Sequence, residues 1–320
     1  MSLLRGKRIL VTGAAGFIGS HLARALVANG NHVIALVKRS SDLWRIQDIL
    51  GRLEIHYSDI NDISVNDFKS KIKEVHLMYH LGAAGVNQSA QDFVSIMRIN
   101  VLGTLSLLQL ARDFNVERFV YCGSCFEYGA GSHLCEDALP APVNEYAASK
   151  LSAGMLVNMF FRKYGLATVY LRPFTVYGPF EDLHRLVPHV ICNVLDGHDI
   201  ELTGGKQTRD MVFIDDVVEG FLAAASKPGI VGNTFNLSSG NEISVKEIVS
   251  AIVELMGNCV KPLFGAQSYR ESELWSLSGD SSKARNMLDW KAQTFLREGL
   301  QKTIQWFQKN REKYPVYMTR

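Results

Sequence analysis

Three glycines near the N-terminus, in RILVTGAAGFIGSHL, restrict the possible folds of this chain strongly. An apolar run typical of a buried strand is followed by Gly13, Gly16 and Gly19, and then by apolar residues at helical spacing. Glycines between a strand and a helix allow a tight turn, a close approach of the backbone to a pyrophosphate, and close helix–strand packing. The GxxGxxG spacing therefore favours dinucleotide binding at the helix N-terminus, with a purely structural turn as the alternative.

Short β-type runs alternate with helical patterns through the first half of the chain. This alternation predicts parallel strands with helices on both faces of the sheet. The expected strands are residues 7–13, 32–37, 53–60, 75–83, 117–124 and 166–179, and the expected helices are residues 17–30, 95–115 and 146–164.

The pattern loosens after residue 179, which predicts a smaller C-terminal part packed against the carboxyl edge of the sheet. The expected fold is α/β, a Rossmann-type doubly wound parallel sheet with a smaller α/β substrate-binding cap. The expected dinucleotide-binding domain is residues 1–176 and 211–236, and the expected substrate domain is residues 177–210 and 237–320. Helical signals in the later part lie at 185–196, 244–257, 281–289 and 296–310, with a strand at 234–238.

Composition excludes several function classes. The 320 residues are 47% hydrophobic and carry a formal net charge of +2, so there is no electrostatic argument for nucleic acid or a membrane as a partner. A basic and then apolar N-terminus is typical of a signal peptide, but the apolar part stops at the glycine turn and suits a first strand better. Five cysteines, an odd number without regular spacing, indicate reduced thiols and a cytoplasmic location.

The residues after the second expected strand bear on which dinucleotide is bound. NAD sites usually carry an acid about 20 residues beyond the glycines, bonding the ribose 2′-hydroxyl. This chain has Lys38, Arg39 and Ser40 there. Because a guanidinium can grip a 2′-phosphate through its planar fork, NADP(H) is favoured, with NAD or an incidentally charged solvated loop as alternatives. Asp59 would bond the adenine amine or cap the next turn.

Tyr146 and Lys150 lie four residues apart in NEYAASKLSAG, so both side chains share one face of the expected helix. A neighbouring ammonium favours the phenolate, and Lys150 is therefore expected to lower the pKa of Tyr146 toward a useful range for proton transfer. Of the 11 tyrosines, only Tyr146 has a lysine at the fourth following position. Ser124, at the end of an intervening strand, completes a candidate catalytic set.

These features together resemble the extended short-chain dehydrogenase/reductases, in the group of nucleotide-sugar epimerases, dehydratases and reductases. The resemblance covers residues 7 to about 300 and includes a late segment, LREGL (296–300). Six motifs occur in the family's order: TGAAGFIG (12–19), HLGAAG (80–85), NVLGT (100–104), YAASK (146–150), LRPFTVYGP (171–179) and RDMVFIDDVV (209–218).

The resemblance implies roles for individual residues. Tyr146 would be the acid/base at the sugar hydroxyl or carbonyl, Lys150 would bond the nicotinamide ribose, and Ser124 would bond the reacting oxygen. The residues expected to contact the dinucleotide are Gly13, Gly16, Phe17, Ile18, Gly19, Lys38, Arg39, Ser40, Asp59, Ile60, Leu81, Gly82, Ala83, Asn100, Tyr146, Lys150 and Pro173.

A nucleotide sugar is the implied substrate, and its expected contacts lie in and beyond the first domain. Ser124, Cys125 and Phe126 would face the sugar. Arg209 resembles the family arginine near the substrate diphosphate, with an ion pair to Asp210 or Asp215 as the alternative. Asn193 and Asn236 are further candidates on the substrate side.

The segment YCGSCFEYG also contains a Cys-x-x-Cys pair around Ser124. A redox dithiol of this spacing would open a helix, whereas Cys122 and Cys125 lie at a strand end. Neither a second such pair nor clustered histidines complete a zinc set. We therefore expect structural thiols, with Cys122 a buried small hydrophobe, and no metal site.

The same set of residues is compatible with several reactions. The family's 4,6-dehydratases carry an acid and a glutamate directly after the Ser/Thr, where this chain has Cys125 and Phe126. Glu127 comes one residue late and, on an extended segment, would face away. An epimerase needs the Ser, Tyr and Lys with a retained NAD, and a 4-ketoreductase needs the same three with exchangeable NADPH. The Lys38–Arg39 pair therefore favours reduction of a C4 keto group, with 4-epimerisation as the alternative and dehydration less favoured.

Two further expectations concern assembly and the absence of catalysis. The helices of 95–114 and 147–163 carry broad apolar faces, and in related enzymes the equivalent pair forms a dimeric four-helix bundle. A homodimer is therefore expected, with simple coverage of the sheet as the alternative. A non-catalytic dinucleotide sensor is the least favoured function, because fold alone does not fix function and the catalytic set is intact.

Overall fold

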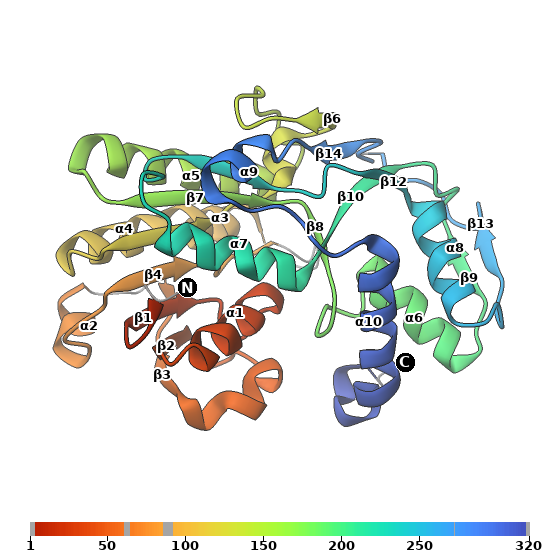
Figure 1. The fold of residues 1–320 in the computed structure, drawn as a ribbon, viewed down its shortest axis with the longest axis horizontal. Coiled ribbons are helices and arrows are strands. Elements are labelled where there is room, and N and C mark those ends of the chain that lie inside the picture. The colour runs from red at the N-terminus through yellow and green to blue at the C-terminus, as the bar shows by residue number, and fades with distance from the viewer. Residues whose placement is uncertain (1–3, 61–64, 86–91, 272, 318–320) are drawn as a thin grey trace.

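The computed structural model describes residues 4–60, 65–85, 92–271 and 273–317. Its centre is a seven-stranded sheet of order β11-β7-β5-β4-β1-β2-β3, in which every neighbouring pair is parallel (Figure 1). The strands are β1 (Arg8–Thr12), β2 (His32–Val37), β3 (Leu53–Tyr57), β4 (Leu77–His80), β5 (Arg118–Cys122), β7 (Thr168–Pro173) and β11 (Thr234–Leu237). The expected doubly wound α/β fold is confirmed.

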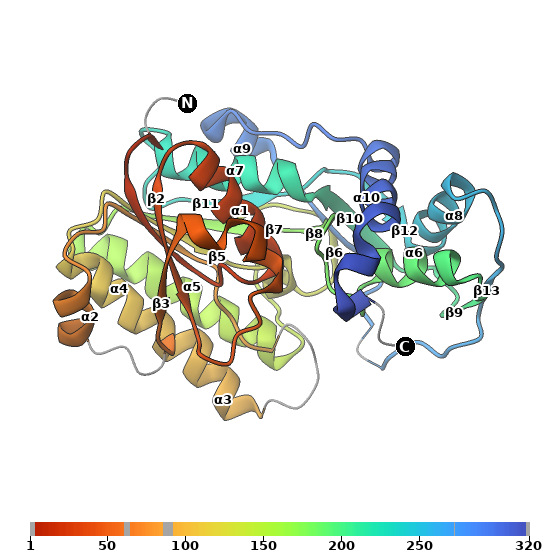
Figure 2. The same ribbon diagram turned by 90° about the horizontal axis from the view of Figure 1, so that it is seen from below.

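Helices cover both faces of this sheet, which explains its near-continuous apolar strands. Ile9, Leu10 and Val11 are all fully buried, as expected for a parallel strand covered on two sides. Figure 2 shows the sheet between the two helix layers. One layer holds α1 (Phe17–Ala28) and α7 (Ile214–Ser226), and the other holds α2 (Val65–Lys71), α4 (Gly103–Asp113) and α5 (Glu145–Tyr164).

The helix expected at 95–115 is present but irregular. It begins as α3 (Phe93–Met97), widens into a π-helical turn at Arg98–Leu102, and continues as α4. By length and composition the whole helix could cross a membrane, a test that core helices of globular proteins also pass. Leu107 and Leu108 are buried in the core beside the sheet, so here its apolar face is part of the fold.

The described C-terminal part consists of helices and small sheets. Strand β8 (Thr175–Tyr177) follows β7 directly and pairs with β10 instead of continuing the main sheet. The helices are α6 (Leu186–Asp196), α8 (Val245–Leu255) and α10 (Leu296–Asn310), and α9 (Ser282–Leu288) lies near β11. The remaining strands are β6 (Gly131–Leu134), β9 (Ile200–Leu202), β10 (Thr208–Phe213), β12 (Glu242–Ser244), β13 (Pro262–Phe264) and β14 (Leu277–Gly279).

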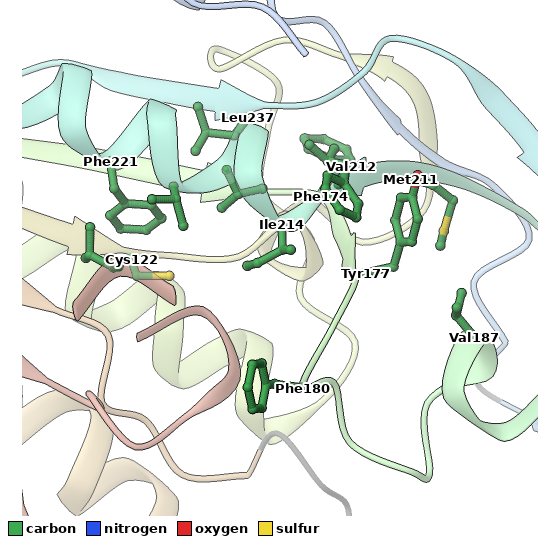
Figure 3. Close-up of a cluster of buried hydrophobic side chains, with 14 of the residues drawn as sticks. Cys122, Phe174, Tyr177, Phe180, Val187, Met211, Val212, Ile214, Phe221 and Leu237 are labelled. Carbon is green, nitrogen blue, oxygen red and sulfur yellow. The ribbon is translucent and has the colours of Figure 1, made fainter. Parts of the chain in front are cut away.

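One hydrophobic core runs from the α1–α7 face of the sheet into the C-terminal part. Figure 3 shows part of it, with Phe221 of α7 beside Cys122 at one side, Phe174, Tyr177 and Val212 at the other, and Ile214 and Leu237 between them. A separate core lies under α4 and α5. Since the first core is shared, any boundary between the two parts is a packed one, and the domain limits expected from the sequence stay a prediction. The sequence reading missed α7 and the 3₁₀ segment η2 (Trp44–Arg52).

Candidate active site

The glycine turn requires glycine at two of its three positions. Gly13 has φ of +71°, and a Cβ there would lie 2.7 Å from Gly82 N, at the end of β4. A Cβ on Gly19 would lie 2.0 Å from Gly13 O. The turn and the segment after β4 therefore meet through their backbones, and this brings together two groups of residues expected to contact a dinucleotide.

The first turn of α1 is suited to bind a phosphate. Gly16 is its N-cap and supplies no capping side chain, and no acid lies in the first turn. The first N–H groups of a helix, here those of Phe17, Ile18 and Gly19, have no acceptor within the helix. Together with the helix dipole they favour an anion at this point. The residues present therefore fit a dinucleotide pyrophosphate.

A pocket of about 340 Å³ opens where β2 and β3 end, lined by Lys38, Arg39, Ser40, Tyr57, Ser58 and Asp59. Lys38 Nζ forms an ion pair with Asp59 Oδ2 at 3.1 Å. This contact neutralises part of the positive charge, and the two roles expected for Asp59 stay predictions. Exposed Arg39 lies over the ring of Tyr57, with 5.7 Å between the guanidinium carbon and the ring centroid.

Ser124 and Tyr146 meet at the carboxyl end of β5. Ser124 is buried, and its side chain accepts a hydrogen bond from Phe126 N at 3.2 Å. The Tyr146 phenol interacts with the same side chain, which favours the ionised form of the phenol. Tyr146 lies in the first turn of α5, which Asn144 caps by accepting from Ala147 N. The two side chains that the sequence analysis paired are therefore in direct contact.

Lys150 follows Tyr146 by one turn, but the expected effect on the tyrosine is not observed. Burial raises the pKa of Tyr146 above its ordinary value, and the interaction with Ser124 only partly offsets this. Lys150 is buried too, which lowers its pKa, and its Nζ lies 4.4 Å from the ring centroid of Tyr121. The expected lowering is therefore wrong for the free protein, where Tyr146 is a phenol able to donate a proton.

Two thiols lie close to Ser124 in the sequence. Cys122 and Cys125 are buried free cysteines, as the sequence analysis expected. Burial raises the pKa of Cys122 to about 11 and that of Cys125 to about 12. Thiols that stay protonated at neutral pH are poor nucleophiles, which agrees with the expectation that the pair carries no redox chemistry.

Glu127 belongs to a buried network rather than to the substrate side. Residues 125–128 form a 3₁₀ turn, so the prediction of an extended segment is wrong. The Glu127 side chain is nevertheless directed into the buried network and not toward the substrate side, as expected. Its carboxylate accepts from Ser124 N at 2.8 Å and from Arg172 Nε at 2.9 Å, and the Tyr170 hydroxyl donates to it as well. Glu127 is fully buried, and burial raises its pKa despite Arg172. Sequence reasoning missed this pair because nothing near residue 127 identifies Arg172 as its partner.

Three predicted substrate-side residues have partners within the protein. Arg209 forms an ion pair with Glu273 at 2.7 Å, and not with Asp210 or Asp215 as in the alternative considered for it; its expected role near the substrate diphosphate stays a prediction. Asn236 is fully buried, accepts from the Tyr128 hydroxyl and donates to two backbone carbonyls, which makes it structural.

Asn193 lies in α6 and donates to the His189 carbonyl at 2.8 Å. Its expected role toward the substrate stays a prediction, as do those of Cys125 and Phe126.

Arg185 is a cation beside the site that the sequence analysis missed. It is the N-cap residue of α6, its side chain is exposed, and its charge acts on both Tyr146 and Cys125. Its only sequence signal is a basic residue directly before the apolar helix LVPHVICNVLD, which is too common to single out.

The remaining expected cofactor residues line or support the same edge of the sheet. Leu81 and Ala83 follow β4, and Pro173 ends β7. Ile60 packs against Gly103 at the start of α4. Asn100 sits in the π-helical turn and bonds both backbone groups of Ala84, so it supports the segment after β4. A π turn inside an α-helix is common at functional sites.

Comparison with known proteins agrees with this geometry. A UDP-glucose 4-epimerase of Mycolicibacterium smegmatis is 33% identical over 311 residues, 94% of this chain and 98% of that protein. The structure of a UDP-glucose 4-epimerase of Thermotoga maritima with UDP-glucose has a TM-score of 0.87 at 29% identity, covering 94% of this chain and 99% of that one. A dTDP-glucose 4,6-dehydratase of Bacillus anthracis in complex with NAD has a TM-score of 0.86 at 25% identity, covering 97% and 100%.

The family assignment rests on the whole first part of the chain. The model of the NAD dependent epimerase/dehydratase family matches residues 9–238, which include the glycine turn, Ser124, Tyr146 and Lys150. The chain therefore belongs to the NAD dependent epimerase/dehydratase family, the enzymes that act on nucleotide sugars with a bound dinucleotide.

Proposed function

We propose that the protein is a nucleotide-sugar 4-epimerase that keeps its NAD bound through the reaction. The observation that carries this proposal is the interaction of the buried Tyr146 phenol with the Ser124 side chain, together with the engagement of Glu127, the one acid in residues 124–128, in a buried network. Similarity to named 4-epimerases supports it. This departs from the sequence analysis, which favoured ketoreduction and gave epimerisation as the alternative.

The protein's own groups would handle the proton while a bound nicotinamide accepts and returns hydride at C4. Tyr146 would exchange the proton of the C4 oxygen, and Ser124 would hydrogen-bond the same oxygen as charge develops on it. Buried Lys150 would place a positive charge one helical turn away. Arg185, exposed beside Tyr146, would attract the negative charge of the substrate diphosphate.

Dehydration needs a carboxyl group that can reach C5 or C6 of the sugar. Cys125 is buried with a raised thiol pKa, and Phe126 has no proton to exchange. Glu127 is fully buried and engaged with Ser124 N, Tyr170 and Arg172. The described segment after Ser124 therefore supports epimerisation better than dehydration, even though 4,6-dehydratases are among the relatives.

The test is incubation of the purified protein with UDP-, dTDP-, GDP- and CDP-hexoses without added cofactor, with separation of the C4 epimers. We expect conversion to an equilibrium mixture with one sugar, and release of NAD only when the protein is denatured. No epimer with any member of the panel, together with protein free of nucleotide, would contradict the proposal.

NADPH-dependent reduction of a 4-keto sugar is the second candidate, and the pocket at Lys38 and Arg39 favours it. No acid ends β2, and Arg39 forms no ion pair among the described residues while Lys38 is bound to Asp59. Arg39 is thus the cation best placed for a 2′-phosphate. Tyr146, held as a phenol by burial, would donate the proton that reduction requires.

Replacing Arg39 with alanine tests this pocket. If a 2′-phosphate binds there, R39A is expected to weaken NADP(H) binding by about tenfold or more and to leave NAD(H) binding unchanged, because one charge-assisted contact is lost. Fluorescence titration with NADPH and NADH measures both affinities. The control is R297A, which removes an exposed arginine of α10. Equal effects of R39A on both nucleotides would show that Arg39 does not select the phosphate.

A non-catalytic dinucleotide sensor stays the least favoured function. It would bind the cofactor and convert no nucleotide sugar, whereas the contact between Ser124 and Tyr146 is what proton transfer requires. A cytoplasmic location, expected from the cysteines, stays a proposal as well.

We also propose a homodimer through the helices of 95–114 and 147–163. Apolar side chains in or directly before these segments are exposed, with Val94 at 64%, Leu102 at 55% and Met155 at 66%. Light scattering is expected to give twice the monomer mass for the wild type and a monomer for Met155→Glu, because a buried charge opposes association. A monomeric wild type at micromolar concentration would contradict this proposal.

A further inference from the structure

A buried chain of hydrogen bonds lies where β1 and β4 end, next to Gly82 and Asn100, two of the residues expected to contact the dinucleotide. Its centre is His80, the last residue of β4, which is 1% exposed. His80 Nδ1 lies 2.7 Å from Thr12 Oγ1, and His80 Nε2 lies 2.8 Å from Thr104 Oγ1. Gly82 N–H donates to Thr12 Oγ1 at 3.1 Å, and Thr104 Oγ1 donates to the Asn100 carbonyl at 2.5 Å.

The Asn100 end of this chain fixes the direction of the bond between Thr104 and His80, and burial of His80 fixes the rest. The Asn100 carbonyl can only accept, so the Thr104 hydroxyl gives its proton there and must accept from His80 Nε2–H. At the other end Thr12 Oγ1 accepts from Gly82 N–H and, with its second lone pair and its own proton, can either accept from His80 Nδ1 or donate to it. Burial decides between the two, because it lowers the pKa of His80 well below the ordinary value. A neutral imidazole that donates from Nε2 has an unprotonated Nδ1, so Thr12 donates to it.

The chain continues from Asn100 to the catalytic helix. Asn100 Nδ2 donates to Ser149 Oγ at 2.8 Å, and Ser149 Oγ donates to the Tyr146 carbonyl at 2.7 Å. Asn100 also accepts from Ala84 N at 2.7 Å. Hydrogen bonds with fixed donors and acceptors thus connect the segment after β4, the π-helical turn and the first turn of α5.

We propose that His80 is a positioning residue, which holds the Gly82 segment and the Asn100 turn in register with Tyr146. His80 itself would contact neither the substrate nor the cofactor. Its two nitrogens, one accepting and one donating, join strand β1 to helix α4 across the end of β4. An error of about 1 Å in such a register can lower turnover by about 100-fold, so a fixed register has catalytic value.

Substitutions at Thr104 test the proposal without changing a site residue. Thr104→Val removes the acceptor for His80 Nε2 and is expected to lower kcat by about tenfold, with substrate KM within about twofold of the wild type. Thr104→Ser keeps the hydroxyl and is expected to restore kcat. Tyr79→Phe is the matched control, because Tyr79 precedes His80 in β4 and its buried hydroxyl has no hydrogen-bond partner among the described residues.

A second readout does not depend on turnover. Nitrogen-15 NMR of the histidine-labelled wild type is expected to give a protonated Nε2 and an unprotonated Nδ1 for His80, unchanged between about pH 6 and pH 8. T104V is expected to disturb this signal and T104S to preserve it. A charged imidazole or a proton on Nδ1 in the wild type would overturn the proposal.

The kinetic test rests on the proposed function. Failure of the positioning role of His80 can be distinguished from failure of that function. If the wild type converts no nucleotide sugar, the proposed function fails and the NMR result alone decides the state of His80. If the wild type is active and T104V matches it in kcat, the positioning role is wrong whatever the tautomer is. Loss of activity in T104S and Y79F as well would indicate general damage to the core and would also overturn it.

Discussion

Tyr146→Phe is expected to lower turnover by about three orders of magnitude while the protein still folds and binds its dinucleotide. The substitution removes only the hydroxyl that interacts with Ser124 and keeps the ring. Without that hydroxyl Tyr146 can no longer exchange the proton of the C4 oxygen, and the carboxyl group of Glu127, bonded to Ser124 N, is engaged with Arg172 and Tyr170. Steady-state kinetics of epimer formation, with nucleotide binding followed by fluorescence, measures both quantities.

The matched control is Tyr164→Phe, which removes a hydroxyl from the last turn of the same helix, far along the chain from Ser124. It is expected to leave turnover unchanged. A fall of less than about tenfold in Y146F would show that another group supplies the proton. Normal turnover by Y146F would remove the basis of the proposed chemistry.

Arg172→Met is expected to destabilise the protein by about 3–5 kcal/mol, the largest stability effect predicted for this site. Arg172 and Glu127 form an ion pair with side chains 7% and 0% exposed. Removing the cation leaves a carboxylate that is buried without its opposite charge. Urea unfolding followed by circular dichroism measures the change in the free energy of unfolding.

The loss in R172M is expected to grow with pH. Burial without Arg172 raises the pKa of Glu127 further above its ordinary value of 4.5, while in the unfolded chain the group ionises near that value. Because the pKa of Glu127 is higher in the folded than in the unfolded protein, the folded state binds the proton more tightly. The contribution of this carboxyl group to stability is therefore fully present below pH 4.5 and is lost as the pH rises through the folded pKa. The variant should therefore be less destabilised at about pH 5 than at about pH 8.

A double variant and a surface control complete this test. R172M/E127Q is expected to be more stable than R172M, because glutamine carries no charge and can still accept from Ser124 N. The control is R297M, which breaks an exposed ion pair with Glu254 and is expected to leave the unfolding midpoint unchanged. Equal stability of R172M and the wild type would mean that the buried pair contributes nothing.

Much of the fold could be predicted because its signals are local. The apolar runs of β1 and β2, the glycine turn between strand and helix, and the periodicity of α5 each depend on residues close in sequence. The expected bounds agree with the structure to within a few residues, as for the strand at 32–37. The Tyr146–Lys150 spacing and the position of Ser124 at a strand end were also local signals, and the structure places Ser124 and Tyr146 in contact.

The parts that could not be predicted depend on contacts between distant residues. Glu127 meets Arg172 45 positions later, and Arg209 meets Glu273 64 positions later. The 3₁₀ turn at 125–128 arises from the capping box of Ser124 and Glu127, which the sequence analysis did not consider. The pKa of Tyr146 was predicted in the wrong direction because burial, which a sequence does not give, outweighs the charge of Lys150.

Epimerisation at C4 by the Ser124–Tyr146–Lys150 site is tested most directly by one isotope experiment. The wild type is incubated with the panel of nucleotide hexoses in deuterium oxide without added cofactor, and the products are analysed by mass spectrometry and NMR. We predict a C4 epimer of unchanged mass, because the hydrogen at C4 leaves and returns as hydride without exchange with solvent. A product that has lost water and carries deuterium at C5 would contradict this account, since it would require the dehydration chemistry for which residues 124–128 offer no free acid.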